Sequence, residues 1–224
     1  MADYEEQTAS SKLAGFIEKR KVAFIIVLAV LICLLAGYII TSAILSKSKA
    51  KDLQALDEIT YTLTSKSNTL EESEVELRRQ NAIEQAMSYT TKGGIVGARA
   101  NMLCADLTFQ QGKFEESAEY WKSAAVKAKK SYIAPIAYYN LAACYEELNN
   151  LDAAAENYKL AADNEEFVLR AHAEFSYGRV LETQGKYTDA VAAYNDINDK
   201  FSNTEWANLA KTRIIALQNA GKAE

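Results

Sequence analysis

The sequence is poor in the residues that build turns, covalent cross-links and histidine-dependent sites. Its 224 residues include 1 proline, 9 glycines, 3 cysteines and 1 histidine. So little proline and glycine excludes a collagen-like chain and argues against a sheet protein with many tight turns. With 49% hydrophobic and 25% charged residues, the composition also differs from that of a disordered chain. We therefore expect an all-α fold.

The scarcity of cysteine and histidine limits the chemistry that the chain can perform. Cys104 and Cys144 occur in helical patterns without C-x-x-C spacing, which predicts small buried side chains rather than a disulfide. A lone His172 excludes Ser-His, Cys-His and multi-histidine zinc sites. The glycine pattern at 93–97 lacks the Lys-Ser/Thr of a phosphate-binding loop. We predict no catalytic residue, no metal site and no cofactor, and hence a protein that is not an enzyme.

Basic residues are not in excess either. The chain has 25 Lys and Arg against 30 Asp and Glu, a formal net charge of −5 and a pI near 5.2. This balance leaves no basic footprint for nucleic acid. The acidic run at 71–76 is typical of a helix start, where carboxylates stabilise free N–H groups.

Residues 22–45 contain no charged residue at all. As a helix, these 24 residues would extend about 36 Å, enough to cross a hydrocarbon core of about 30 Å. The run is longer than the apolar region of a signal peptide, and no clear cleavage site comes after it. We predict a single transmembrane helix at 22–45 preceded by a short tail, residues 1–21.

The charges that flank this segment favour one orientation only slightly. Four basic residues precede it and three come after it, namely Lys12, Lys19, Arg20 and Lys21 before and Lys47, Lys49 and Lys51 after. The short tail favours a cytoplasmic N-terminus, which places the C-terminal domain outside the cytoplasm. The opposite orientation stays open.

Residues 46–97 show two amphipathic patterns. Leucine and isoleucine recur at helical spacing first at 53, 56, 59 and 63, and apolar residues recur again at 70, 75, 77, 83 and 87. The run 67–69 separates the two patterns, and the run 93–97 links them to the rest of the chain. We predict a helical hairpin that acts as an N-terminal cap; a divergent first repeat and a self-association surface are the alternatives.

Three later segments align with one another. Each has a helix, a short turn at Gly112, Asn149 or Gly185, and a second helix, with spacings of 37 and 36 residues. Aligned small residues allow the helices to approach closely: Ala105, Ala142 and Gly178 in the first helices, and Ser117, Ala154 and Ala190 in the second. Aligned large residues, Trp121, Tyr158 and Tyr194, fill the space between hairpins.

These residues resemble the tetratricopeptide repeat, whose first helix carries W-x₂-L-G-x₂-Y with a period of about 34. The clearest match runs from Tyr138 to Tyr145, with Tyr138 in place of Trp and Ala142 in place of Gly. The resemblance implies an α-solenoid of helix hairpins, with three repeats and a C-terminal capping helix over 98–219.

In that family, regularly spaced residues of each first helix face a concave groove that binds protein partners. The corresponding residues here are Arg99, Met102, Asp106 and Phe109, then Ile136, Tyr139 and Glu146, then Phe175, Arg179 and Glu182 together with His172. Their mixture of apolar, aromatic and charged side chains suits an extended or helical peptide, or an unfolded client segment. The alternative is that the 46–97 helices cover these residues.

A short tail, one span and a C-terminal repeat domain together resemble the YfgM-like ancillary subunits of the bacterial Sec translocon. The resemblance implies a single-pass protein of the bacterial inner membrane, with its N-terminus in the cytoplasm and its repeats in the periplasm. Its partners would be translocon subunits and periplasmic chaperones. An envelope assembly or division scaffold, and a scaffold facing the cytoplasm, are the alternatives.

Overall fold

The computed structural model describes residues 9–223, and every regular element in that range is helical. This confirms the predicted all-α fold. The chain divides into two compact units, residues 1–51 and 52–224.

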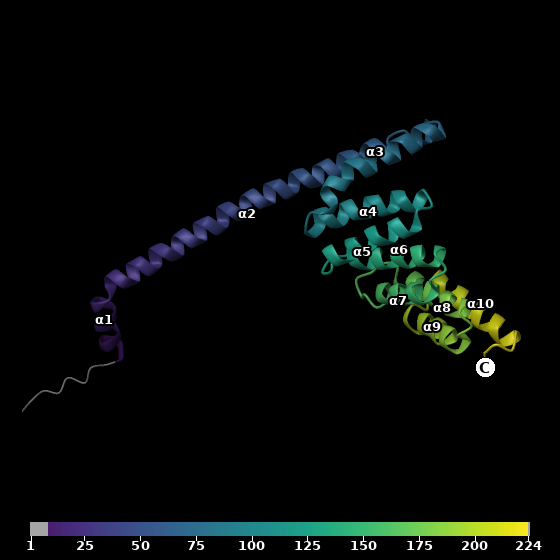
Figure 1. Cartoon of the computed structure of the whole chain (residues 1–224). Coiled ribbons are helices and arrows are strands. Elements are labelled where there is room, and N and C mark those ends of the chain that lie inside the picture. Colours follow the sequence, from purple (N-terminus) through teal and green to yellow (C-terminus); the bar gives the residue numbers. More distant parts are fainter. Residues whose placement is uncertain (1–8, 224) are drawn as a thin grey trace, which may run out of the picture. The chain divides into compact units, whose positions relative to one another are not determined.

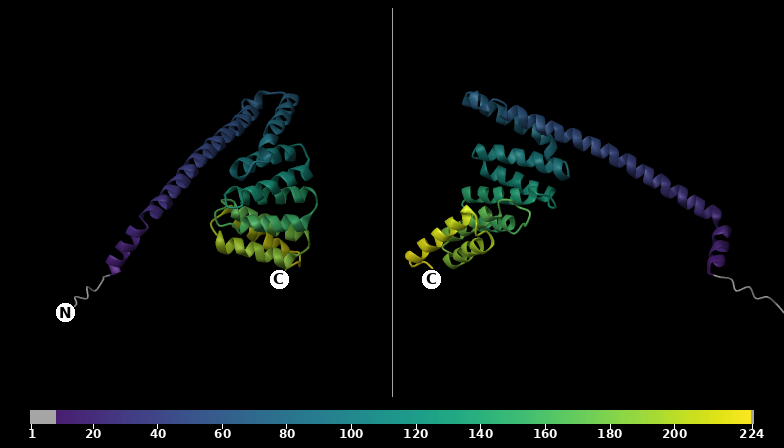
Figure 2. Two further views of the ribbon diagram at one scale, coloured as in Figure 1. Left: turned by 60° about the vertical axis from the view of Figure 1, so that its left-hand side comes forward. Right: turned by 180° about the vertical axis from the view of Figure 1, so that it is seen from behind.

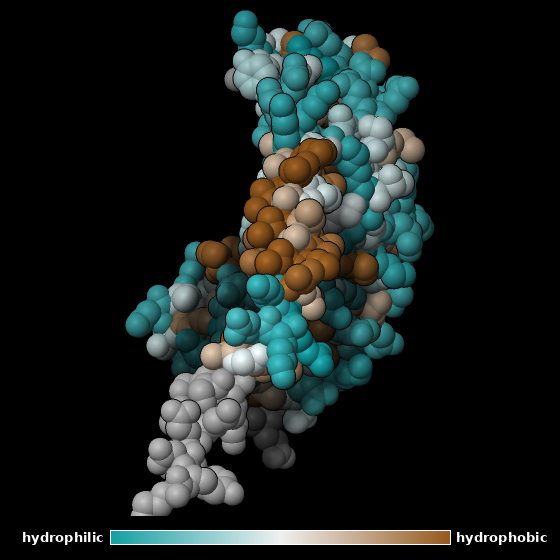
Figure 3. Space-filling model, turned by 90° about the vertical axis from the view of Figure 1, so that its left-hand side faces the viewer, coloured by the Kyte–Doolittle hydropathy of each residue, from teal (hydrophilic) through white to brown (hydrophobic). Residues whose placement is uncertain are grey.

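The first unit contains α1 (Ala9–Lys19) and the N-terminal part of α2 (Lys21–Thr64). Apolar side chains surround this part of α2 and are exposed (Figure 3). The helix is long and apolar enough to cross a membrane, and its most apolar stretch is not buried by other protein. Helix α2 continues without a break from the apolar segment at 22–45 into the amphipathic pattern that begins at residue 53.

The second unit is an α-solenoid of stacked hairpins (Figures 1 and 2). It begins with the C-terminal part of α2, a short 3₁₀ turn (Ser67–Thr69) and α3 (Glu72–Thr90). The next hairpins are α4 (Gly94–Gln110) with α5 (Phe114–Lys127), α6 (Ile133–Glu147) with α7 (Leu151–Ala162), and α8 (Arg170–Thr183) with α9 (Tyr187–Lys200). The last helix, α10 (Glu205–Asn219), packs on α8 and α9.

The three hairpins turn in the same way because each first helix ends with a residue in the left-handed region. Gly112, Asn149 and Gly185 have φ angles of 72°, 54° and 74°. The next residue in each turn donates its N–H back to the helix: Lys113 to the Thr108 carbonyl (3.0 Å), Asn150 to Tyr145 (2.8 Å) and Lys186 to Leu181 (2.9 Å). This pairing satisfies carbonyls at the helix end and reverses the chain within three residues.

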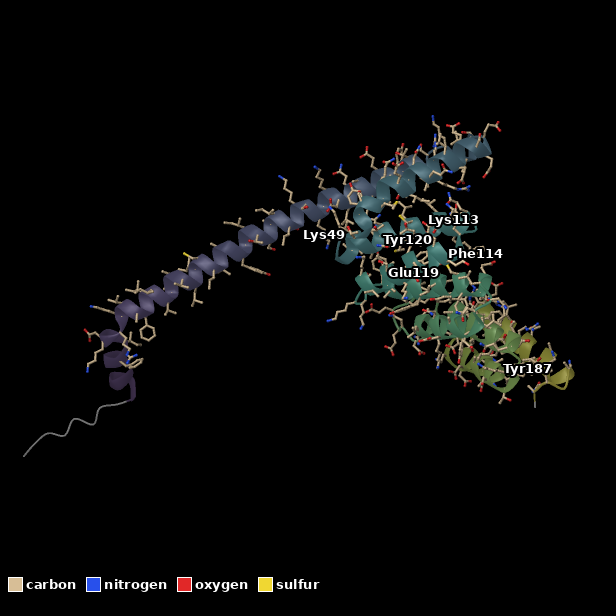
Figure 4. All side chains as sticks on the ribbon, viewed as in Figure 1. Lys49, Lys113, Phe114, Glu119, Tyr120 and Tyr187 are labelled. Carbon is tan, nitrogen blue, oxygen red and sulfur yellow. The ribbon has the colours of Figure 1, made fainter. Side chains whose placement is uncertain are left out.

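A partly buried apolar residue begins each second helix and closes the turn. Phe114 packs edge-to-face on Phe109 with ring centroids 5.1 Å apart, while Leu151 and Tyr187 join the cores of their own hairpins. Phe114 and Tyr187 are labelled in Figure 4, at the starts of α5 and α9. The turn geometry and this contact together fix the angle at which each second helix leaves the turn.

The predicted small residues all lie where helices approach closely. Ala105, Ala142 and Gly178 are buried, and a Cβ atom on Gly178 would lie 2.7 Å from a ring carbon of Tyr194. Trp121 is buried among residues of α4, α5 and α6, which makes the first and second hairpins share one core. Such shared cores stabilise hairpins that could not bury their apolar faces alone.

Helix α3 contributes buried alanines to the core that the α2–α3 hairpin shares with α4. Ala82 and Ala86 are buried against Leu56 and Ile59 of α2 and against α4. Two members of the predicted apolar stripe, Leu77 and Met87, are instead exposed. Small side chains place α3 close to both neighbours, so the face that carries Ala82 turns inward. Ile83 also packs against this core, whereas Leu77 and Met87 turn outward.

The glycine-rich run predicted as a linker is mostly helical. Helix α4 begins at Gly94, and Val96 and Gly97 are buried in its first turns. A Cβ atom on Gly97 would overlap the Lys92 carbonyl, so glycine is required for the close approach of the preceding chain. The linker between α3 and α4 is therefore shorter than the sequence indicated.

Candidate functional site

The residues predicted to line a binding surface lie on α4, α6 and α8, the first helix of each hairpin. Their spacings of three, four or seven residues place them on one side of each helix. Contacts between neighbouring helices join these sides into one surface that also includes three residues of α10. We call this surface the first-helix face. It comprises Arg99, Met102, Asp106, Phe109, Ile136, Tyr139, Glu146, His172, Phe175, Arg179, Glu182, Trp206, Leu209 and Arg213.

An aromatic cluster crosses this face from α6 to α10. The Tyr139 ring lies 5.1 Å from His172, and its hydroxyl lies within hydrogen-bond distance (3.0 Å) of the His172 Nε2 atom. His172 stacks on Trp206 with centroids 3.9 Å apart, and Phe175 lies 5.4 Å from Trp206. All four side chains are partly exposed, so the cluster presents aromatic surface across α6, α8 and α10.

Burial lowers the pKa of His172, and the positive charge of Arg179 lowers it further. The neutral imidazole is therefore favoured near neutral pH, and a neutral ring is the form that stacks on Trp206 without carrying charge into the cluster. The cluster is thus an uncharged patch on a face that carries charged residues to either side.

Two glutamates are each held by a tyrosine and by an arginine of the next first helix. Glu146 accepts hydrogen bonds from the Tyr158 hydroxyl (2.7 Å) and from Arg179 (2.6 Å). One repeat later, Glu182 accepts them from the Tyr194 hydroxyl (2.8 Å) and from Arg213. These clamps tie consecutive repeats together and neutralise four of the charges on the first-helix face.

The Glu182 clamp leads to a stability prediction. Burial alone would raise the pKa of Glu182, but the hydrogen bonds from Arg213 and Tyr194 outweigh it and lower that pKa. We expect Glu182→Gln to lower the free energy of unfolding by about 2 kcal/mol at pH 7, because charge-assisted hydrogen bonds are lost. A group with a lowered pKa stabilises the fold above its unfolded-state pKa and loses that effect as the pH falls. The difference between wild type and variant should therefore shrink below about pH 4 in denaturant titrations.

The control for this prediction is Glu147→Gln, because Glu147 is exposed on α6 beside Glu146. Its effect should stay within about 0.5 kcal/mol. Equal losses for the two variants would contradict the clamp.

Asp106 differs from the other charged residues of the face. Arg99 is paired with Asp57 of α2 (2.6 Å), and the four clamp residues are paired with one another. Asp106 has no ion-pair partner among the described residues, although its side chain is exposed. Desolvation by the surrounding protein raises its pKa to about 6.

The contribution of α10 to this face was not predicted. The sequence indicated only a capping role for α10, whereas Trp206 and Arg213 contact His172 and Glu182 on the first-helix face. The signal was present, because the spacing 206, 209 and 213 repeats the spacing 172, 175 and 179 of α8. Helix α10 thus occupies the position of a further first helix.

The two cysteines of the second unit are free and buried, as predicted. Burial raises the pKa of Cys104 to about 12 and also raises that of Cys144, whose thiol lies 3.3 Å from the Ser117 hydroxyl. Both thiols therefore remain protonated and serve as small packing groups. Within residues 9–223, no group of three or more metal-ligating side chains is close enough together to hold an ion.

Comparisons with known proteins agree with this architecture. A family described as tetratricopeptide repeat-like domain matches residues 16–219. A TPR repeat-containing protein of Treponema pallidum (strain Nichols) is 32% identical over 139 residues, which cover 62% of this chain and 58% of that protein. The match therefore spans less than two thirds of the relative's length.

One similar solved structure is described as the crystal structure of the apo form of RapI. It aligns with a TM-score of 0.52 over 79% of this chain and 67% of that one, at 17% sequence identity. At this identity the likeness concerns the fold alone.

Proposed function

The chain belongs to the tetratricopeptide repeat-like family, and from this membership we propose that it is a membrane-anchored adaptor whose first-helix face binds a segment of a partner protein. Its repeats are a scaffold of the kind that mediates protein–protein interactions. The observation that carries the proposal is the partly exposed aromatic cluster, which extends over three successive first helices. Large aromatic side chains at a surface supply much of the binding energy of protein interfaces.

The proposed anchor is the apolar part of α2. Its length and composition suit a bilayer, and its apolar side chains have no other protein to cover them within the described residues. The proposed orientation has a cytoplasmic N-terminus and a periplasmic solenoid, at the bacterial inner membrane. It is supported by the slight excess of basic residues before the span.

For the partners, we propose translocon subunits, periplasmic chaperones or exported chains. The support is the combination, within residues 9–223, of one helix apolar enough to span a membrane and a repeat solenoid after it, which resembles the ancillary translocon subunits. Tethering to the membrane would raise the local concentration of the face, so that a weak interaction could gain about 10² to 10⁴ in effective affinity.

The direct test is photo-crosslinking in intact cells from a probe at Tyr139, with adducts identified by mass spectrometry. Translocon subunits or exported chains would support the secretion role. Division or outer-membrane assembly proteins would replace it with the envelope-scaffold alternative. Alkaline phosphatase fused after Ala220 would be active only outside the cytoplasm, and inactivity would overturn the proposed orientation.

The aromatic cluster yields a binding prediction for the captured partner. Tyr139→Ala combined with Phe175→Ala should weaken capture at least tenfold, since two central aromatic contacts are lost. Helicity measured by circular dichroism should change little. The matched control is Tyr61→Ala with Tyr132→Ala, because both tyrosines are exposed and lie outside the face. If the control weakens capture as much as the double variant, the binding surface lies elsewhere.

A further inference from the structure

The charged residues of the first-helix face differ in whether a residue of opposite charge pairs with them. Arg99, Arg179 and Arg213 each pair with a carboxylate of the protein. Glu146 and Glu182 are the partners of two of these arginines and also accept tyrosine hydroxyls. Each of these five groups already has a partner of opposite charge, so an incoming charged group would gain less from pairing with any of them.

Asp106 has no such partner among the described residues, and its neighbours on the same face of α4 are apolar. It lies on α4 between Met102 and Phe109, both partly buried and both packed against the core that α4 shares with α6. The described residues supply it with no ion pair, and apolar neighbours replace part of its water. A carboxylate in such a setting gains more from an incoming cation than one that is fully solvated.

Beyond α4, towards the C-terminus, the middle of the first-helix face consists of apolar and aromatic side chains. The next residues along the face, on α6, α8 and α10, are Tyr139, Phe175 and Leu209, each at the position equivalent to Met102. They continue the position of Met102 along the next three helices of the face, and Trp206 lies 5.4 Å from Phe175. A segment lying along these positions would therefore place one end at a carboxylate and the remainder on apolar and aromatic side chains.

We propose that the first-helix face recognises a partner segment that carries a lysine or arginine at one end of an apolar run, with Asp106 receiving the cation. This inference rests on the proposed function and specifies the class of segment that the face selects. Neighbouring packed helices lie about 8–10 Å apart, and a chain in the polyproline II conformation has three residues per turn and advances about 3.1 Å per residue. Every third side chain of such a segment lies on the same side, about 9 Å further along, so its apolar residues are expected at every third position after the basic one.

The experiment uses the full chain in lipid nanodiscs and fluorescent ten-residue peptides with serine spacers. One peptide carries lysine and then leucines at every third position, and a second has the reverse order. In matched peptides, norleucine replaces lysine and so keeps the aliphatic stem but removes the charge. Fluorescence anisotropy against empty nanodiscs measures the binding.

We expect one lysine peptide to bind the wild-type protein about tenfold more tightly than its norleucine counterpart, as a charge-assisted hydrogen bond implies. In Asp106→Asn, a nearly isosteric change at an exposed site, the two peptides should bind equally. The preference should also fall about threefold between pH 7.5 and pH 5.5, as Asp106 becomes protonated. Protonated His172 would also repel the lysine peptide, so the same ratio measured in Asp106→Asn gives the part of the change that does not come from Asp106.

Two results would overturn the proposal, and they are distinguishable. Equal binding of lysine and norleucine peptides to the wild-type protein would remove the role of Asp106 and leave the adaptor proposal intact. No binding of any peptide, together with unchanged partner capture by Tyr139→Ala with Phe175→Ala, would remove the first-helix face itself as the binding surface.

Discussion

Gly178→Leu is expected to lower the free energy of unfolding by about 3 kcal/mol, because overpacking at a close helix contact has no room to relax. Even a Cβ atom at this position would lie 2.7 Å from Cε1 and 3.0 Å from Cδ1 of Tyr194. The Tyr194 ring cannot move aside, since it is fully buried and its hydroxyl is bonded to Glu182. Thermal unfolding measured by circular dichroism should show a midpoint lowered by about 6–12 °C.

The control is Thr183→Leu, an exposed position near the end of the same helix. It adds the same side chain without a close neighbour and should change the midpoint by no more than about 2 °C. Tyr194→Leu provides a second check, because a smaller partner should reduce the further loss caused by Gly178→Leu. If the two losses were simply additive, the contact between Gly178 and Tyr194 would not be the cause.

Much of the solenoid could be predicted from the sequence because its determinants are local and repeated. The left-handed turn residues, the small residues at helix contacts and the large residues between hairpins each recur with nearly the same period. A property that recurs three times is distinguishable from chance in a single sequence. The α2–α3 hairpin occurs once. Apolar spacing predicted the buried face of α2, which carries Leu56 and Ile59, but not that of α3, where Ala82 is buried and Leu77 is exposed.

The site was less predictable because its contacts join helices of different repeats. The spacing within each helix identifies Tyr139, His172 and Phe175 as members of one face. Nothing in that spacing shows that Trp206 stacks on His172, or that Asp57 of α2 pairs with Arg99. That no described cation pairs with Asp106 is equally a property of the whole stack, because it depends on which cations the neighbouring repeats bring close.

Trp121→Ala is expected to have the largest effect on stability, with a loss of about 3–5 kcal/mol. Trp121 is 2% exposed and packs with Ala118 of its own helix, Ala105 of α4 and Leu141 of α6. Truncation would leave a cavity lined largely by alanines, which cannot extend to fill it. Since this core joins the first hairpin to the second, hydrogen exchange should show faster opening of α4 and α5 than of α8 and α9.

In the later repeats, tyrosines occupy the position of Trp121, and they suggest a second variant that tests the same core. Tyr158 and Tyr194 each donate a hydroxyl hydrogen bond to a glutamate, whereas the position equivalent to those glutamates in the first repeat is Phe109. Trp121→Tyr would therefore place a hydroxyl in the same part of the core without its glutamate acceptor, at a cost of about 1–3 kcal/mol. Adding Phe109→Glu should recover part of that loss, because it supplies the acceptor that the later repeats use. If instead the double variant is less stable than the sum of its single changes, the three hairpins do not share this packing arrangement.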